Sequence, residues 1–249
     1  MGRITETVKA LLIVNVIFFI GSQLIGDVAY EYFALWFIKN TNFQVWQIVT
    51  HMFMHGDFMH ILFNMYALWA FGSPIEQMLG QKRFLFFYFS AGIGAALLHT
   101  LVNLYAYQKG FNGLAELGWT PVEISNYIQE AYATNKFRIP EGMDQDTLRS
   151  MLQSYANPAV GASGAIYGIL VAFGMMFPNV ELFLLFVPVP IKAKYFIPVL
   201  IGIDLFSGFT GYSLFGGSIA HFAHVGGALF GFIMMYYWKR NQFNNNRWY

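Results

Sequence analysis

Mostly apolar stretches recur along the chain, separated by polar or aromatic-rich segments. A membrane-crossing α-helix needs about 20 predominantly apolar residues, and six stretches approach or reach that length. We therefore predict an all-α, polytopic membrane protein, a single domain over residues 1–249 with six transmembrane helices. The predicted spans cover residues 9–26, 58–79, 83–106, 162–177, 194–212 and 220–238.

The first apolar stretch follows Arg3 and Lys9, a pattern that secretory signal peptides share. No small-residue cleavage site comes after it, and further spans follow, so we interpret it as a retained first helix. The loop between the first two spans, residues 27–57, is long and rich in aromatic residues.

A polar stretch, residues 107–158, separates the third and fourth spans and predicts two short amphipathic helices outside the membrane. Thr120, Pro121 and Glu123 combine a capping hydroxyl, a proline at the first helical position and a carboxylate three residues after the cap. A second apolar run at helical spacing follows Asp144. The apolar faces must cover the membrane surface, the rest of the domain or another copy, and the pattern does not distinguish these.

Composition agrees with a bilayer environment. Only 11% of the residues are charged, whereas soluble domains carry about 25%. The net charge of +1 shows no excess of basic residues of the kind that indicates nucleic-acid binding. The absence of cysteine excludes disulfides, thiol catalysis and zinc–thiolate sites.

The basic residues predict the direction of the chain. If the first span starts inside, nine of the fourteen Lys and Arg residues lie on the inner side. We therefore expect both termini in the cytoplasm. No organellar targeting segment is visible, which favours a bacterial cytoplasmic membrane.

Polar residues inside apolar spans are costly and therefore indicate function. Ser163 lies fifteen residues before Pro178, and His224 lies fifteen residues before Lys239, at the expected ends of their spans. At about 1.5 Å per residue, both side chains lie roughly 22 Å above the inner boundary. The two residues are thus predicted at one depth.

Small residues surround both of these side chains. Ser163 lies between Gly161 and Gly168, and Gly227 and Gly231 follow His224 at small-xxx-small spacing. Helices with such faces approach closely, so the serine and the histidine are expected within hydrogen-bond reach.

His60 and Asn64 are four residues apart and point the same way near the outer end of the second span. Each can donate a hydrogen bond to a developing oxyanion, together with the backbone N–H of Ser163. Taken alone, the pair is more simply interpreted as forming hydrogen bonds between neighbouring helices.

Together these residues resemble the motifs of the rhomboid family of intramembrane proteases, over about residues 45 to 240. The matching motifs are Gly161-x-Ser163-Gly164 with Tyr167, His55-Gly56 followed by His60-x-x-x-Asn64, and Ala223-His224-x-x-Gly227-x-x-x-Gly231.

The resemblance implies a rhomboid-like bundle and a serine endopeptidase that cleaves peptide bonds in or beside the transmembrane segments of other proteins. It implies a Ser–His dyad without a third acid, no cofactor and no metal, with membrane-protein substrates and the lipid bilayer as partners. The implied roles are nucleophile for Ser163, general base for His224, oxyanion binding for His60 and Asn64, shaping of the entry loop for Gly161, and packing against His224 for Tyr167.

Two features depart from the family pattern. Trp46 is followed by Gln47, where the family often has arginine, which leaves open how the 27–57 loop is held. The 107–158 stretch is long for its position and lies directly before the nucleophile's helix, so we hypothesise that it influences substrate access.

Alternative interpretations concern the function and several single residues. A rhomboid-like pseudoprotease that binds membrane proteins for trafficking or quality control is the main alternative, and a small transporter is another. His51, His55 and His60 lie close together, but no His-Glu-x-x-His motif supports a metal site.

Three further polar residues in or beside the spans have simpler interpretations. We expect structural or solvent-facing roles for His99 and His221. For Asp204 we expect an ordinary interhelical hydrogen bond rather than a place as a third catalytic residue.

Overall fold

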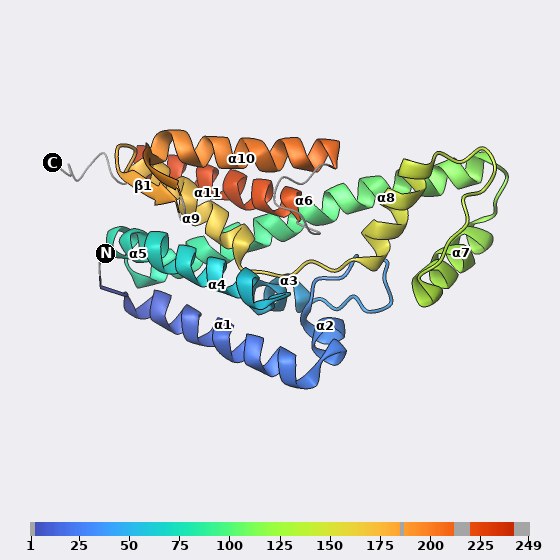
Figure 1. Ribbon diagram of the computed structural model, residues 1–249, viewed down its shortest axis with the longest axis horizontal. Helices are drawn as coiled ribbons and strands as arrows, with labels where there is room; N and C mark the ends of the chain where they lie inside the picture. Colours follow the sequence, from blue (N-terminus) through green and yellow to red (C-terminus); the bar gives the residue numbers. More distant parts are fainter. Residues whose placement is uncertain (1–2, 185–186, 212–219, 242–249) are drawn as a thin grey trace.

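The computed structural model describes residues 3–184, 187–211 and 220–241, which form a bundle whose long helices lie roughly along one axis (Figure 1). The main helices are α1 (Glu6–Ile25), α4 (Phe58–Ala67), the π-helical segment η2 (Leu68–Gly72), α5 (Ser73–Leu79), α6 (Gln81–Glu116), α9 (Ser163–Met176), α10 (Ala193–Thr210) and α11 (His221–Asn241). The shorter elements are α2 (Asp27–Phe33), α3 (Gln47–Thr50), the 3₁₀ helix η1 (His51–Phe53), α7 (Pro121–Thr134), α8 (Gln145–Ala156), and the strands β1 (Glu181–Leu184) and β2 (Val187–Lys192).

Where the structure describes it, every predicted span is helical except for single residues at some of its ends; residue 212 of the fifth span lies outside the described residues. Among the described helices, α1, α6 and α10 are long and apolar enough to cross a membrane. Helix α9 has 14 residues, about 21 Å, and is shorter than the roughly 30 Å hydrocarbon core. The second predicted span is divided by η2. The count of six crossings therefore stays a prediction.

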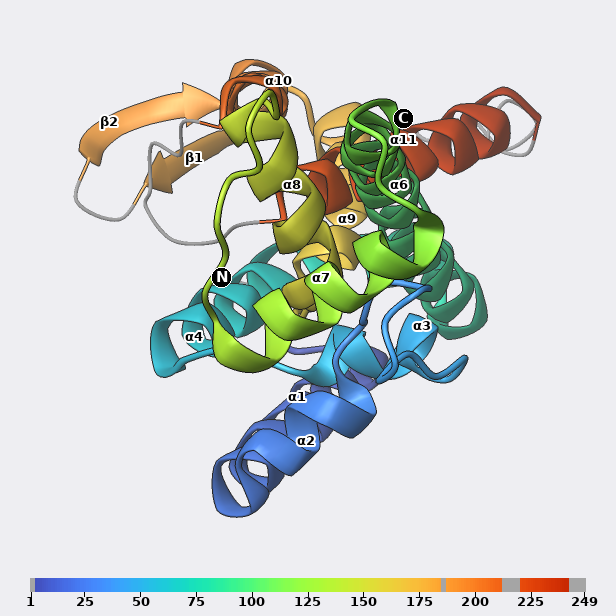
Figure 2. The same ribbon diagram turned by 90° about the vertical axis from the view of Figure 1, so that its right-hand side faces the viewer.

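Helix α9 lies at the centre of the bundle, among α4, α6, α10 and α11 (Figure 2). Most of its residues are buried, from Gly164 to Phe173. Helix α1, at the periphery, buries only a few positions and exposes apolar side chains such as Ile17 and Leu24. The exposed apolar side chains of α1 suit a helix that faces lipid, and the burial of α9 suits a helix surrounded by protein.

Glycines set the spacing between α9 and α11. A Cβ atom on Gly227 would lie 1.8 Å from the carbonyl oxygen of Gly164, and one on Gly231 would lie 2.5 Å from Cα of Gly168. The predicted close approach of these two helices is therefore confirmed. Small residues of α6 complete the contact, since a Cβ on Gly164 would meet Cβ of Ala95 at 2.4 Å.

Helix α6 continues beyond the predicted end of its span at residue 106 and reaches Glu116. Its 36 residues extend about 54 Å, so its last turns project past the bundle and carry α7 and α8 (Figure 1). The start of the predicted 107–158 segment is thus a continuation of α6. Residues 107–116 contain no proline, and their two glycines, Gly110 and Gly113, are helical.

Both predicted amphipathic helices are present as α7 and α8. Thr120 and Glu123 form a reciprocal capping box on α7, and the side chain of Asp144 caps α8. Their apolar faces pack against each other, against the end of α6 and against Phe37 of the 27–57 loop. The rest of the domain, rather than another copy, therefore covers these faces.

The link predicted near residues 178–193 contains a two-stranded antiparallel hairpin, so the all-α prediction is wrong for this segment. Strands β1 and β2 pair Glu181 with Lys192 and Leu182 with Ile191. Prolines at 188 and 190 disfavour a helix in β2, because proline lacks the N–H that a helix interior uses.

The α9–α11 contact predicts a stability difference between two glycine substitutions. Gly227→Ala forces the helices apart and is expected to lower the free energy of unfolding by about 3 kcal/mol. Gly202→Ala on α10, where a Cβ meets no atom within 4 Å, is the control and is expected to be neutral or slightly stabilising. Thermal unfolding in detergent measures both; equal midpoints would contradict the close contact.

Candidate active site

The segment that leads into α9 is hydrogen-bonded at two points to the 27–57 loop. Leu35 and Ala159 exchange two backbone hydrogen bonds of 2.9 Å, and the N–H of Gly161 donates to the carbonyl of His51 at 2.9 Å. The backbone on which Ser163 begins its helix is therefore held by pairing, although the segment itself has no regular structure.

Gly161 occupies a backbone conformation that favours glycine, with φ of +122°. A Cβ at this position would lie 2.7 Å from Nε2 of His60 and 3.6 Å from Oγ of Ser163. Gly161 therefore allows the histidine ring and the serine hydroxyl to approach the same stretch of backbone, in agreement with the expectation that it shapes the loop.

Ser163 and His224 meet across the α9–α11 contact. Nε2 of His224 lies 2.8 Å from Oγ of Ser163, although 61 positions separate the residues in the chain. Tyr167, one turn along α9 from Ser163, stacks on the His224 ring with centroids 4.2 Å apart and planes 13° apart. The structure thus brings together the three residues that the sequence places on these helices.

Asp204 of α10 reaches the other side of the imidazole. Its Oδ1 atom lies 3.1 Å from Nδ1 of His224 and 2.6 Å from Nδ1 of His221. Its Oδ2 atom accepts a hydrogen bond from the hydroxyl of Tyr167. Asp204 does bond between helices, as expected, but one of its partners is the predicted base; sequence alone does not show which face of α10 meets α11.

His60 and Asn64 lie on one face at the start of α4. The backbone N–H of His60 donates to the side chain of Asp57, which caps the helix, at 2.8 Å. Asn64 follows one turn later and is buried. The ring of His60 lies beside Gly161, so α4 brings this side chain to the loop that enters α9.

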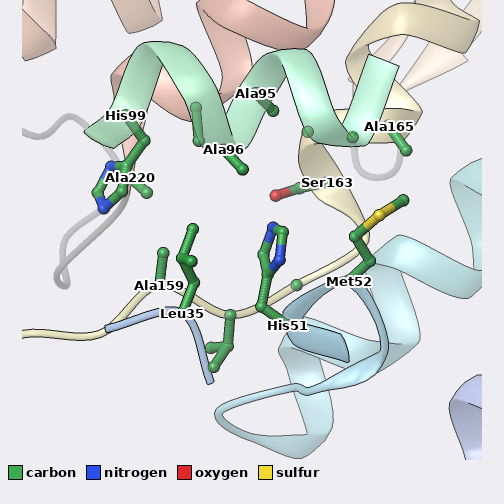
Figure 3. Close-up of a pocket in the computed structure, with 15 residues that line it drawn as sticks. Leu35, His51, Met52, Ala95, Ala96, His99, Ala159, Ser163, Ala165 and Ala220 are labelled. Atoms are coloured by element: carbon green, nitrogen blue, oxygen red, sulfur yellow. The ribbon is translucent and has the colours of Figure 1, made fainter. Parts of the chain in front are cut away.

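A small cavity of about 20 Å³ adjoins Ser163 (Figure 3). The close-up shows Ser163 between α6, with Ala95 and Ala96, and the side chain of His51. Nδ1 of His51 lies 2.8 Å from the carbonyl oxygen of Gln47, and burial lowers the pKa of His51 to about 4. His51 is therefore neutral at physiological pH and donates this hydrogen bond.

Gln47 holds the 27–57 loop at the position where the family often has arginine. Its Nε2 donates to the carbonyls of Glu31 and Asn42 at 2.9 Å, and its Oε1 accepts from the N–H of Gln44 at 3.1 Å. The side chain is fully buried. A neutral amide thus supplies the loop contacts that the motif comparison left open.

The remaining histidines have local partners. Nε2 of His99 lies 3.0 Å from the side-chain nitrogen of Asn103, and His55 packs against His60 with ring centroids 5.0 Å apart. His221 is bound to Asp204 rather than facing solvent alone. Within residues 3–184, 187–211 and 220–241, no three histidine or carboxylate side chains are grouped as a metal site requires.

Comparison with known proteins gives a consistent family match. The model of the rhomboid domain matches residues 42–125 and 142–241. The gap between these two matched stretches, residues 126–141, lies inside the predicted 107–158 segment.

Curated relatives include the mitochondrial rhomboid protein 1 of Saccharomyces cerevisiae, 28% identical over 190 residues, covering 76% of this chain and 41% of the relative. The mitochondrial presenilin-associated rhomboid-like protein of Mus musculus is 28% identical over 198 residues, covering 76% and 38%. An uncharacterized mitochondrial rhomboid protein of Schizosaccharomyces pombe is 28% identical over 209 residues, covering 78% and 52%. The chain thus spans between about two fifths and half of the length of these relatives.

These relatives contradict the predicted bacterial cytoplasmic membrane, because all three are mitochondrial proteins. The prediction relied on the lack of a targeting segment at the start of the chain. That start says nothing about location when the chain covers only part of its relatives. The placement of both termini in the cytoplasm relied instead on the distribution of basic residues. It referred to the cytoplasm of that bacterial membrane and is contradicted together with it.

The contacts of Gln47 predict that the amide stabilises the loop. Gln47→Met keeps the volume but removes the partner of partly buried backbone groups of Glu31, Asn42 and Gln44, and is expected to cost about 2 kcal/mol of unfolding free energy. Gln44→Met, at an exposed side chain, is the matched control. Hydrogen exchange across residues 31–47 and thermal unfolding measure the effect; unchanged exchange in Gln47→Met would contradict it.

Proposed function

Because the chain belongs to the rhomboid family, we propose that it is an intramembrane serine endopeptidase that cleaves other membrane proteins in or beside their transmembrane segments. One observation carries the proposal: Nε2 of His224 lies 2.8 Å from Oγ of Ser163, the distance at which an imidazole accepts a hydroxyl proton.

The proposed reaction starts with attack of Ser163 Oγ on the carbonyl carbon of the scissile peptide bond. Nε2 of His224 takes the hydroxyl proton as the C–O bond forms, and then gives it to the leaving amine as the C–N bond breaks. Water next attacks the acyl-enzyme with the same histidine as base, which releases the acid and restores the serine. His224 exposes 13% of its side-chain surface and Ser163 is also partly exposed, which is compatible with access by water.

Negative charge develops on the carbonyl oxygen during attack and needs hydrogen-bond donors. We assign this role to His60, Asn64 and the backbone N–H of Ser163. The approach of the His60 ring to Gly161 supports the assignment, because it puts a donor beside the loop that enters α9. Stacking of Tyr167 on His224 supports its proposed part in holding the base.

The nucleophile is tested by labelling the detergent-solubilised protein with a fluorophosphonate probe, which needs no known substrate. Wild type is expected to be labelled, and Ser163→Ala and His224→Ala are expected to lose labelling, because attack needs both the hydroxyl and its base. Ser207→Ala, at a buried serine of α10, is the control and keeps labelling. Labelling of Ser163→Ala, or none of folded wild type, would refute the proposal, and the second result would favour a binding protein.

The oxyanion assignment predicts a loss of kcat. Replacement of His60 or Asn64 by alanine is expected to lower kcat by about 100- to 1000-fold with little change in KM, because these bonds strengthen only in the transition state. Phe63→Ala, at an exposed position of α4, is the control. Cleavage of a reporter with one transmembrane segment measures both constants; values of kcat near wild type in both variants would contradict the assignment.

A further inference from the structure

Asp204 is a buried carboxylate inside an apolar helix, with only 5% of its surface exposed. A carboxylate in such a place is costly unless donors surround it. Three donors do so here, and they come from two other helices: the hydroxyl of Tyr167 on α9, and Nδ1 of His221 and of His224 on α11. The carboxylate thus occupies the junction of α9, α10 and α11.

The contact with His224 determines which ring nitrogen carries the proton. An ionised carboxylate only accepts hydrogen bonds, so the Nδ1 atom 3.1 Å from Asp204 must be the N–H of the neutral ring. Nε2 then has a free lone pair, and it is this atom that lies 2.8 Å from Ser163 Oγ. The tautomer that Asp204 selects is the one a general base needs.

The carboxylate is itself held by groups that do not touch the serine. Tyr167 binds Oδ2, and His221 binds Oδ1 at 2.6 Å, so the carboxylate cannot turn away from His224 without losing one of them. Tyr167 also stacks on the face of the His224 ring. The imidazole is therefore fixed on its face by Tyr167 and on its Nδ1 edge by Asp204.

We infer that Asp204 is a positioning residue for the reaction, so that the site works as a Ser163–His224–Asp204 triad rather than a dyad; the inference rests on the proposed protease function. When Nε2 takes the serine proton, the ring becomes an imidazolium. Asp204 keeps its charge, accepts from Nδ1–H throughout, and stabilises that cation from a buried position. No proton passes to the carboxylate.

A purely structural role would also put Asp204 at a helix junction, so the test must separate the two. The rate constant kinact and the affinity KI of fluorophosphonate labelling are measured for wild type, Asp204→Asn and Ser207→Ala, each normalised to the folded fraction from gel filtration in detergent. Ser207 lies on the same helix, is buried, and its hydroxyl has no hydrogen-bond partner among the described residues, so it is a matched control.

Asp204→Asn is expected to lower kinact by more than about 10-fold with KI unchanged, because the amide lacks the charge that stabilises the imidazolium. Ser207→Ala is expected to match wild type. A smaller fall in kinact, or a fall explained by the folded fraction, would make Asp204 an interhelical anchor and overturn the inference. Wild type that fails to label would instead refute the proposed function.

A second measurement needs no Asp204 variant and remains decisive if Asp204→Asn does not fold. The chain has six histidines, so ¹⁵N spectra of histidine-labelled protein in lipid are simple, and His224 is assigned by the signal lost in His224→Gln. The expected wild-type spectrum has a protonated Nδ1 and an unprotonated Nε2 for His224. A ring protonated at Nε2 alone would overturn the inference.

Discussion

The close contact between α9 and α11 is the constraint on which the proposed site depends. Ser163 and His224 lie 61 positions apart, and their hydrogen bond exists only because Gly164 and Gly227 let two backbones touch. In lipid, helices gain little from burying apolar surface, so close packing of small residues and interhelical hydrogen bonds must hold them together. The geometry that serves the proposed chemistry is also the geometry that stabilises the bundle.

A second constraint fixes the approach to the nucleophile. The chain before α9 is paired to the 27–57 loop at Leu35 and His51, and that loop is held from within by Gln47. The same loop contacts the α7–α8 subdomain through Phe37. Segments far apart in the sequence therefore hold the backbone immediately before Ser163 in place. A catalytic site requires such fixed geometry.

Buried polar residues tie the helices of the bundle to one another. Glu76 of α5 accepts from the backbone N–H groups of Thr7 and Val8 at 3.0 and 2.9 Å, and so satisfies donors at the start of α1. Asp204 likewise connects α10 to the two helices that carry Ser163 and His224. Each of these carboxylates is costly alone and is retained where several donors converge.

Local patterns in the sequence predicted the helical spans, the cap at Thr120, and a shared depth for Ser163 and His224, because apolar periodicity, capping and rise per residue act within a few turns of the chain. Packing between distant segments decided the rest: the continuation of α6 under α8, the β1–β2 hairpin, and the partners of Gln47 and Asp204. A single sequence does not record which helix faces meet, so the contact between Asp204 and His224 is decided by the packing of α10 against α11.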